Sequence, residues 1–313
     1  MEPLSKRKRK TYLIIFFIVF ILFIPAIIFY AIGYRITLTE GIIQTGGIFI
    51  NIEESDTEVF INNKLVKRPG LFRRNYFIQD LTPGIFSIAV TKKNYQTWQK
   101  TVKVLPALVA EANPFLFPTT LNSRKILPFF LPANEESGEA ATTTATSSPH
   151  TIPNLEFTAV RSLFSTTTTF TTRIKPAELR ATTTLQKTFH NLATTTEEKQ
   201  NRNITIYKDK NKLYAAWLGN LNEAPFFFCS DLICNDTIIF YTVKKSIAHF
   251  DFYPGRNDLV IVASADGVFV VELDSRPEQN IQFLYETPGS TFRVGQGGVI
   301  YINDKTNYFA VEL

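Results

Sequence analysis

The chain has 313 residues, an apolar fraction of 45% and a formal net charge of +5. Its length suits one to three domains. The positive excess comes from one run of five basic residues: Lys6, Arg7, Lys8, Arg9 and Lys10. Without this run the chain is near neutral, whereas a nucleic-acid-binding domain needs a basic face. We therefore predict that the protein has no nucleic-acid partner.

An uncharged apolar segment follows the basic run. It covers Thr11 to Tyr34, 24 residues in all, and has tyrosines near both ends. As a helix it would be about 36 Å long, which exceeds the roughly 30 Å hydrocarbon core of a bilayer. Tyrosines are typical of the two membrane interfaces. We predict a transmembrane helix over 11–34, a cytoplasmic tail over 1–10 and the lipid bilayer as a partner.

The flanking charges predict the orientation of this helix. Five basic residues precede it and only Arg35 follows closely, so the positive-inside rule places the N-terminus in the cytoplasm. A cleaved signal peptide is the competing interpretation, but such peptides have shorter apolar regions, of about 7–15 residues. We favour an uncleaved signal anchor, with the C-terminal domains outside the cytoplasm.

Residues 44–117 change to the period-two pattern of β-strands. Ile48, Ile50 and Ile52 alternate with other residues, and Leu81-Thr82-Pro83-Gly84 has the residue types of a tight turn. The predicted unit is a small antiparallel β-sandwich.

This unit resembles a PEGA domain, a small surface module of bacteria and archaea. The residues that match the family pattern are Asp56 to Asn63, Leu81, Pro83, Gly84, Val90, Lys93, Asn94 and Tyr95. Residues 54–57 depart from the Pro-Glu-Gly-Ala turn, and Asn63 and Asn94 replace the usual glycines, although asparagine tolerates the left-handed conformation. The resemblance implies an adhesive, spacer or envelope-binding role and no catalysis.

Two aromatic residues at the end of this unit have two interpretations. Tyr95 and Trp98 could form an exposed pair on which a sugar stacks, or they could fill the core of the sandwich. We favour the core, because a small sandwich needs bulky side chains there.

Residues 118–200 are rich in threonine and proline. Repeated threonine clusters, such as Thr166 to Thr169, predict a low-complexity linker that cannot bury enough apolar surface to order itself. A bare spacer is favoured over an O-glycosylated stalk. Two apolar islands, 125–131 and 155–160, are expected to be strands that pack on the last domain.

Residues 201–313 contain closely spaced strand signals and predict an all-β domain. Eleven candidates occur, Pro225 to Cys229 among them, with hairpin-like connections such as Ala265-Asp266-Gly267. Phe250 to Val262 and Ala265 to Asp274 resemble the blades of TolB-like and WD-repeat propellers. Eleven strands make fewer blades than a closed propeller usually has, so the ring is expected to be completed by the islands, to be completed by another chain, or to stay open. An open edge would favour a homo-oligomer.

The two cysteines, Cys229 and Cys234, lie between apolar strands of this domain. Outside the cytoplasm a disulfide between them is expected, and the alternative is two reduced thiols. They are too few for a zinc site, and no Cys-x-x-Cys redox motif is present.

Catalytic and cofactor motifs are lacking in the sequence. His150 and His190 lie in the low-complexity region, and His249 is interpreted as a strand residue. The carboxylates available for acid-base chemistry are Asp251, Asp258, Asp266 and Glu272, whose spacing fits turns between strands. We predict no metal, no cofactor and no enzymatic activity.

Three functions remain in order of preference. The first is a non-catalytic, membrane-anchored envelope protein that binds or spaces a protein or cell-wall glycan at the surface. The second is a membrane-tethered sensor or regulatory subunit of an envelope complex. The third is a hydrolase of the outer face, which would need paired carboxylates in a pocket.

Overall fold

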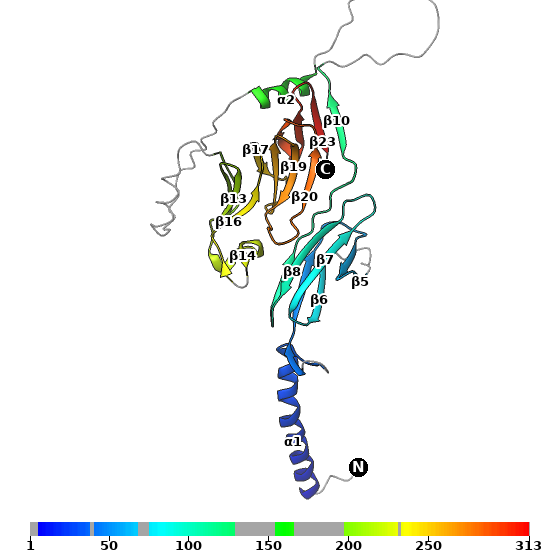
Figure 1. Ribbon diagram of the computed structural model, residues 1–313. Coiled ribbons are helices and arrows are strands. Elements are labelled where there is room, and N and C mark those ends of the chain that lie inside the picture. Colours follow the sequence, from blue (N-terminus) through cyan, green and yellow to red (C-terminus); the bar gives the residue numbers. More distant parts are fainter. Residues whose placement is uncertain are drawn as a thin grey trace, which may run out of the picture. The chain divides into compact units, whose positions relative to one another are not determined.

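The computed structural model describes residues 6–37, 41–67, 75–128, 154–165, 197–230 and 233–312 (Figure 1). The chain divides into two units. Unit 1 comprises Met1–Pro118 with Arg276–Glu278, and unit 2 comprises Thr119–Ser275 with Gln279–Leu313.

Helix α1 (Lys6–Ala31) opens unit 1. It has 26 residues, contains Pro25, and buries none of its side chains against the protein. Its most apolar 18-residue window has a mean hydropathy of 3.1, so α1 is long and apolar enough to cross a membrane. The helix ends three residues before the predicted end of the span, and a strand begins at Tyr34.

A short hairpin follows the helix. Strands β1 (Tyr34–Thr37) and β2 (Gly41–Gln44) pair antiparallel as a separate two-stranded sheet. The apolar run predicted Tyr34 as part of the helix, and residues 35–43 carried no predicted element, so this hairpin was not predicted.

Two larger sheets make up the β-structure of unit 1. One has the order β6 (Asn75–Leu81), β3 (Gly46–Asn51), β9 (Val109–Ala112), and the other has the order β5 (Lys64–Lys67), β4 (Glu58–Ile61), β7 (Gly84–Thr91), β8 (Trp98–Val104). The alternation at Ile48, Ile50 and Ile52 is confirmed, because all three side chains are buried. The expectation of purely antiparallel pairing is wrong, since β3 pairs parallel with β9.

Asn63 and Asn94, which stand at predicted turns, adopt the conformation expected of them. Their φ angles are 62° and 63°, and the neighbouring Asn62 has a φ of 48°. These values lie in the left-handed region, which asparagine enters more readily than most residues.

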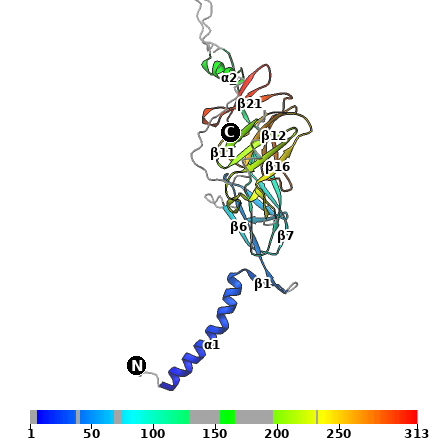
Figure 2. The ribbon, with the colours of Figure 1, turned by 90° about the vertical axis from the view of Figure 1, so that its left-hand side faces the viewer.

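Unit 2 contains three four-stranded sheets (Figures 1 and 2). The first sheet has the order β11 (Glu198–Asn201), β12 (Ile204–Asp209), β13 (Lys212–Trp217), β16 (Thr237–Thr242). The central sheet has the order β17 (Ile247–Phe252), β18 (Leu259–Ser264), β19 (Gly267–Glu272), β20 (Ile281–Tyr285). The third has the order β10 (Asn122–Ile126), β23 (Tyr308–Glu312), β22 (Ile300–Asn303), β21 (Thr291–Val294). The described strands form no closed ring.

The first apolar island contributes to the third sheet. Strand β10 pairs with the C-terminal strand β23, with Lys125 opposite Phe309. The prediction that this island packs on the last domain as a strand is confirmed for residues 125 and 126; the strand ends there, and residues 129–131 lie outside the described residues.

The second island was wrongly predicted as a strand. It is helix α2 (Leu155–Ser165), which begins where the side-chain oxygen of Asn154 accepts a hydrogen bond from the backbone N–H of Glu156 (3.0 Å). Phe157, Val160 and Phe164 follow helical spacing and belong to a cluster with Ile126 and Ala310 of the third sheet. Cap and spacing together define the helix.

A second strand prediction also fails. Residues 226–228 form a short 3₁₀ turn, η2 (Phe226–Phe228), and the predicted strand is reduced to β14 (Cys229–Ser230). Phe227 and Phe228 are buried in the core between the first and central sheets. Three consecutive phenylalanines indicate burial, but burial does not distinguish a strand from a turn.

Candidate functional site

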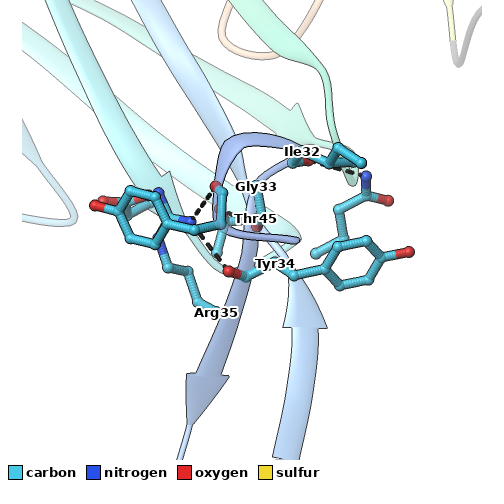
Figure 3. Close-up of polar contacts among 8 residues, drawn as sticks. Ile32, Gly33, Tyr34, Arg35 and Thr45 are labelled. Atoms are coloured by element: carbon cyan, nitrogen blue, oxygen red, sulfur yellow. Dashed lines mark hydrogen bonds and ion pairs between the residues drawn. The ribbon is translucent and has the colours of Figure 1, made fainter. Parts of the chain in front are cut away.

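Gly33 lies at the junction between the apolar helix and the first strand of unit 1. Helix α1 ends at Ala31, and β1 starts at Tyr34, so only Ile32 and Gly33 lie between them. Gly33 has a φ of +93°, which is the left-handed conformation common just after a helix. This residue turns the chain out of the helix and into the hairpin (Figure 3).

The two residues between the helix and β1 also carry carbonyl groups that need donors. Here the donors come from the hairpin and the residue after it. Gln44 Nε2 donates to the carbonyl of Ile32 (3.2 Å), and both the backbone N–H and the hydroxyl of Thr45 donate to the carbonyl of Gly33 (each 2.9 Å) (Figure 3). The two residues that follow the apolar helix are therefore tied to β2 and to Thr45.

Arg35 adds a charged cap. Its Nη1 donates to the carbonyls of Tyr30 (2.8 Å) and Tyr34 (3.0 Å), and its Cζ lies 3.8 Å from the centroid of the Tyr30 ring. A cation is stabilised both by the negative end of a helix dipole and by an aromatic face. Arg35 is thus held at the helix end from two sides.

The same guanidinium reaches the larger sheets. Arg35 Nη2 lies 2.7 Å from Asp80 Oδ1, and Asp80 belongs to β6. Since the arginine side chain is only 24% exposed, the pair is partly shielded from water. Arg35 therefore connects α1, β1 and β6.

Close backbone packing continues this junction into the β6-β3-β9 sheet of unit 1. The carbonyl of Thr45 accepts from the N–H of Ala107 (3.0 Å), and the N–H of Gly47 donates to Leu108 (2.9 Å). A Cβ at Gly46 would lie 2.4 Å from the carbonyl oxygen of Leu105. A larger residue at Gly46 would therefore push the start of β3 away from residues 105–108.

The basic residues predicted to set membrane orientation form the start of α1. Lys6, Arg7, Lys8, Arg9 and Lys10 are all helical and exposed. They lie at the opposite end of α1 from Arg35. The orientation that they favour remains a prediction.

The aromatic pair is not arranged for sugar stacking. Trp98 is only 1% exposed, and it is among the largest fully buried side chains. Tyr95 is partly buried, and the ammonium of Lys92 lies 4.3 Å from its ring centroid while also pairing with Glu54 at 2.5 Å. Burial lowers the pKa of Lys92, but the hydrogen bond and charge of Glu54 outweigh this effect and raise the pKa overall. The structure places Trp98 in the core, the alternative that we favoured.

The two cysteines lie opposite each other on β14 and β15 (Ile233–Cys234), and their sulfur atoms are bonded at 2.02 Å. The described part of the chain has no free cysteine. The disulfide closes a short hairpin of unit 2.

The carboxylates considered for catalysis have structural partners. Asp258 receives two hydrogen bonds from Arg256, both 2.7 Å, and Asp251 lies 3.2 Å from Lys199. The other two have partners as well: Asp266 pairs with Lys245 and Glu272 with Asn280. They stabilise turns and strand ends. No group of metal-binding side chains occurs among the residues that the structure describes.

His249 is a strand residue, as interpreted from the sequence. It lies on β17, its Nδ1 is 2.6 Å from Glu197 Oε1, and its ring contacts Phe292 of the third sheet at 4.9 Å. Burial raises the pKa of Glu197, but hydrogen bonding and charge from His249 outweigh this effect and lower it overall. His150 and His190 lie outside the described residues.

Sequence reasoning missed the polar cap of the helix. It used Arg35 only as a charge beyond the span and gave no role to Gln44 or Thr45. A signal did exist, because a glycine just after an apolar helical run, here Gly33, is typical of a helix end. No family model and no curated protein matches the chain.

Proposed function

We propose that the protein is a single-pass membrane protein that presents two β-rich units outside the cytoplasm and binds or spaces an envelope component without catalysis. The observation that carries the proposal is α1, whose apolar side chains are all unburied; Arg35 binds the carbonyl of Tyr30 in its last turn, and Gln44 and Thr45 bind the carbonyls of the two residues that follow it. Such a surface is stable in lipid, and it would be costly in water.

The charge distribution supports the orientation. Five basic residues occupy the start of α1, whereas Arg35, the basic residue just after the helix, is paired with Asp80. The asymmetry agrees with the positive-inside rule. The bond between Cys229 and Cys234 also suits an oxidising compartment.

A binding experiment tests the function of the β-units. Full-length protein in detergent would be sedimented with envelope fragments of the cells that make it, after treatment with protease, with glycan-degrading enzymes, or with neither. We expect co-sedimentation, and the treatment that abolishes it identifies the partner as protein or glycan. No co-sedimentation with untreated fragments would contradict a binding role.

The short junction favours a second candidate, a membrane-tethered regulatory subunit. Since only two residues separate α1 from β1 and both are hydrogen-bonded to Gln44 and Thr45, a displacement of the β-sheets of unit 1 would reach the helix directly. A membrane partner that co-purifies with the native chain, but not with a chain carrying six Gly-Ser residues after Gly33, would support this role. Equal recovery with both chains would contradict it.

A further inference from the structure

The β1–β2 hairpin has two chemically different faces. Cross-strand partners project to the same face, so Tyr34, Ile36, Ile42 and Gln44 share one face while Arg35 and Ile43 share the other. Arg35 on the second face pairs with Asp80 of β6. The first face is therefore on the side of the hairpin opposite to the one that contacts β6.

The first face is unusually apolar and exposed. Ile36 is 85% exposed and Ile42 is 67% exposed, and the two are directly opposed across the hairpin. A pair of adjacent isoleucines leaves a continuous apolar surface in contact with solvent. Within the described part of the chain, no other element covers it.

The hairpin also lacks the usual support for a short sheet. It has four residues in each strand and pairs with no third strand among those described. An isolated two-stranded hairpin is at best marginally stable in water and needs a surface to pack on. The exposed Ile36 and Ile42 show on which side of the hairpin such a packing surface would be needed.

The contacts of the hairpin with helix α1 indicate what would pack on this apolar face. Tyr34, on the apolar face, makes an edge-on contact with Phe29 of α1 at 5.3 Å, and Phe29 is itself exposed. Thr11 to Ala31 would span about 31 Å as helix, close to the roughly 30 Å hydrocarbon core. The hairpin thus begins at the level of the outer interface, where Tyr30 and Tyr34 are the aromatic residues typical of that depth.

We propose that the β1–β2 hairpin lies in the outer membrane–water interface and inserts Ile36 and Ile42 among the lipids. The inference rests on the proposed membrane anchor and adds a second, lateral lipid contact to it. The apolar face continues the exposed apolar surface of α1 through the contact of Tyr34 with Phe29, while Arg35 holds the opposite face to β6. The hairpin would then restrict the rotation and tilt of α1 relative to the membrane surface.

Depth-dependent quenching tests this placement. Single cysteines replace Ile36 or Ile42 in the full chain, carry an environment-sensitive NBD fluorophore, and are reconstituted into phosphatidylcholine vesicles containing spin-labelled lipids. Because Cys229 and Cys234 are bonded to each other, the introduced thiol would be the one that reacts. Labels at Leu22 in α1 and at Ile85 in β7, which is 72% exposed, serve as lipid-embedded and aqueous controls.

We expect blue-shifted emission at positions 36 and 42. Quenching should be roughly twofold stronger from a spin label near the headgroup than from one deep in the acyl chain, because interfacial elements sit about 5–10 Å into this boundary. Quenching no greater than at Ile85 would overturn the inference. A blue shift without lipid quenching would also overturn it, since a second copy or another protein would then cover the isoleucines.

The Leu22 label separates this result from the anchor itself. If Leu22 is quenched by the deep spin label and position 36 is not, the anchor holds and the hairpin inference fails. If Leu22 is not quenched either, the proposed membrane anchor fails as well.

Discussion

Helix α1 and strands β18 and β19 are both apolar, yet their environments are opposite. None of the side chains of α1 is buried, whereas every residue of β18 and β19 is buried. The strands are covered by the first sheet on one side and contact β21 of the third sheet. Among the residues that the structure describes, the helix has no such neighbours, so an apolar run alone does not reveal its environment.

The difference follows from what the remaining chain can supply. Each strand has two faces, which two neighbouring sheets can cover, but α1 is apolar around its whole circumference. A soluble helix usually shows one apolar stripe, and a helix apolar on all sides needs either a large core or lipid. Protein therefore surrounds β18 and β19, whereas the exposed apolar circumference of α1 agrees with the proposed membrane anchor.

The largest effect is expected from a charged residue placed in the buried strand β18. Ile261→Asp places an unpaired charge at a fully buried position, and we expect unit 2 to lose about 4 kcal/mol or more of its unfolding free energy. Urea unfolding of the full chain measures this loss. Ile239→Asp, at a 45% exposed strand position, is the control and should change stability by only about 0.5 kcal/mol. Equal effects would contradict the assignment of β18 to the core.

A charge in α1 should instead affect the membrane contact. Ile21→Lys lies near the middle of the apolar segment, and we expect insertion to become about 2.5–3.5 kcal/mol less favourable, with unchanged urea unfolding of unit 2. The fraction of chain that resists alkaline extraction from membranes measures this change, with Ile21→Leu as control. If Ile21→Lys destabilises unit 2 and leaves extraction unchanged, α1 packs on protein and not on lipid.

The junction should show a smaller effect. Arg35→Ala, Asp80→Ala and the double variant form a cycle, and we expect a coupling of about 0.5–1 kcal/mol because the pair is only partly shielded. Unfolding of unit 1, followed by Trp98 fluorescence, measures it. Arg35→Lys preserves the charge but not the fork of donors, so it should retain part of the coupling. No coupling would mean that the pair contributes nothing to holding the hairpin.

The smallest effect concerns α2 and pH. The hydrogen bond and charge of Arg124 hold the pKa of Glu156 below its usual range, although partial burial opposes them. A lowered folded-state pKa stabilises the protein above the unfolded-state pKa of about 4.3, and this stability is lost as the pH falls through the folded-state value. The exposed pair should contribute less than about 1 kcal/mol.

Urea midpoints at pH 7 and at pH 3 measure this contribution. The difference between the two midpoints should be smaller in Glu156→Gln than in the native chain. An identical difference in both chains would show that the ion pair does not stabilise the docking of α2.

Period-two and hydropathy patterns predicted much of this architecture. They located α1, the buried isoleucines of β3 and the strands of the central sheet, because each pattern follows directly from burial on one face or on all faces. The asparagine turns were also predicted, since their conformation is a local property.

Features that depend on distant partners were not predicted. The parallel pairing of β3 with β9 joins segments about sixty residues apart, and no local pattern encodes it. Helix α2 was missed because its three apolar residues were read within a low-complexity region, without the cap at Asn154. The capped helix end was missed because Gln44 and Thr45 reach it only after the β1–β2 hairpin has formed.

The orientation of α1 is the central claim, and thiol labelling on intact cells tests it most directly. Single cysteines at Lys8 and at Ile239, an exposed position of unit 2, would be treated with a membrane-impermeant maleimide before and after the cells are permeabilised. We predict labelling of position 239 on intact cells and of position 8 only after permeabilisation. Labelling of position 8 on intact cells, with protection of position 239, would contradict the account.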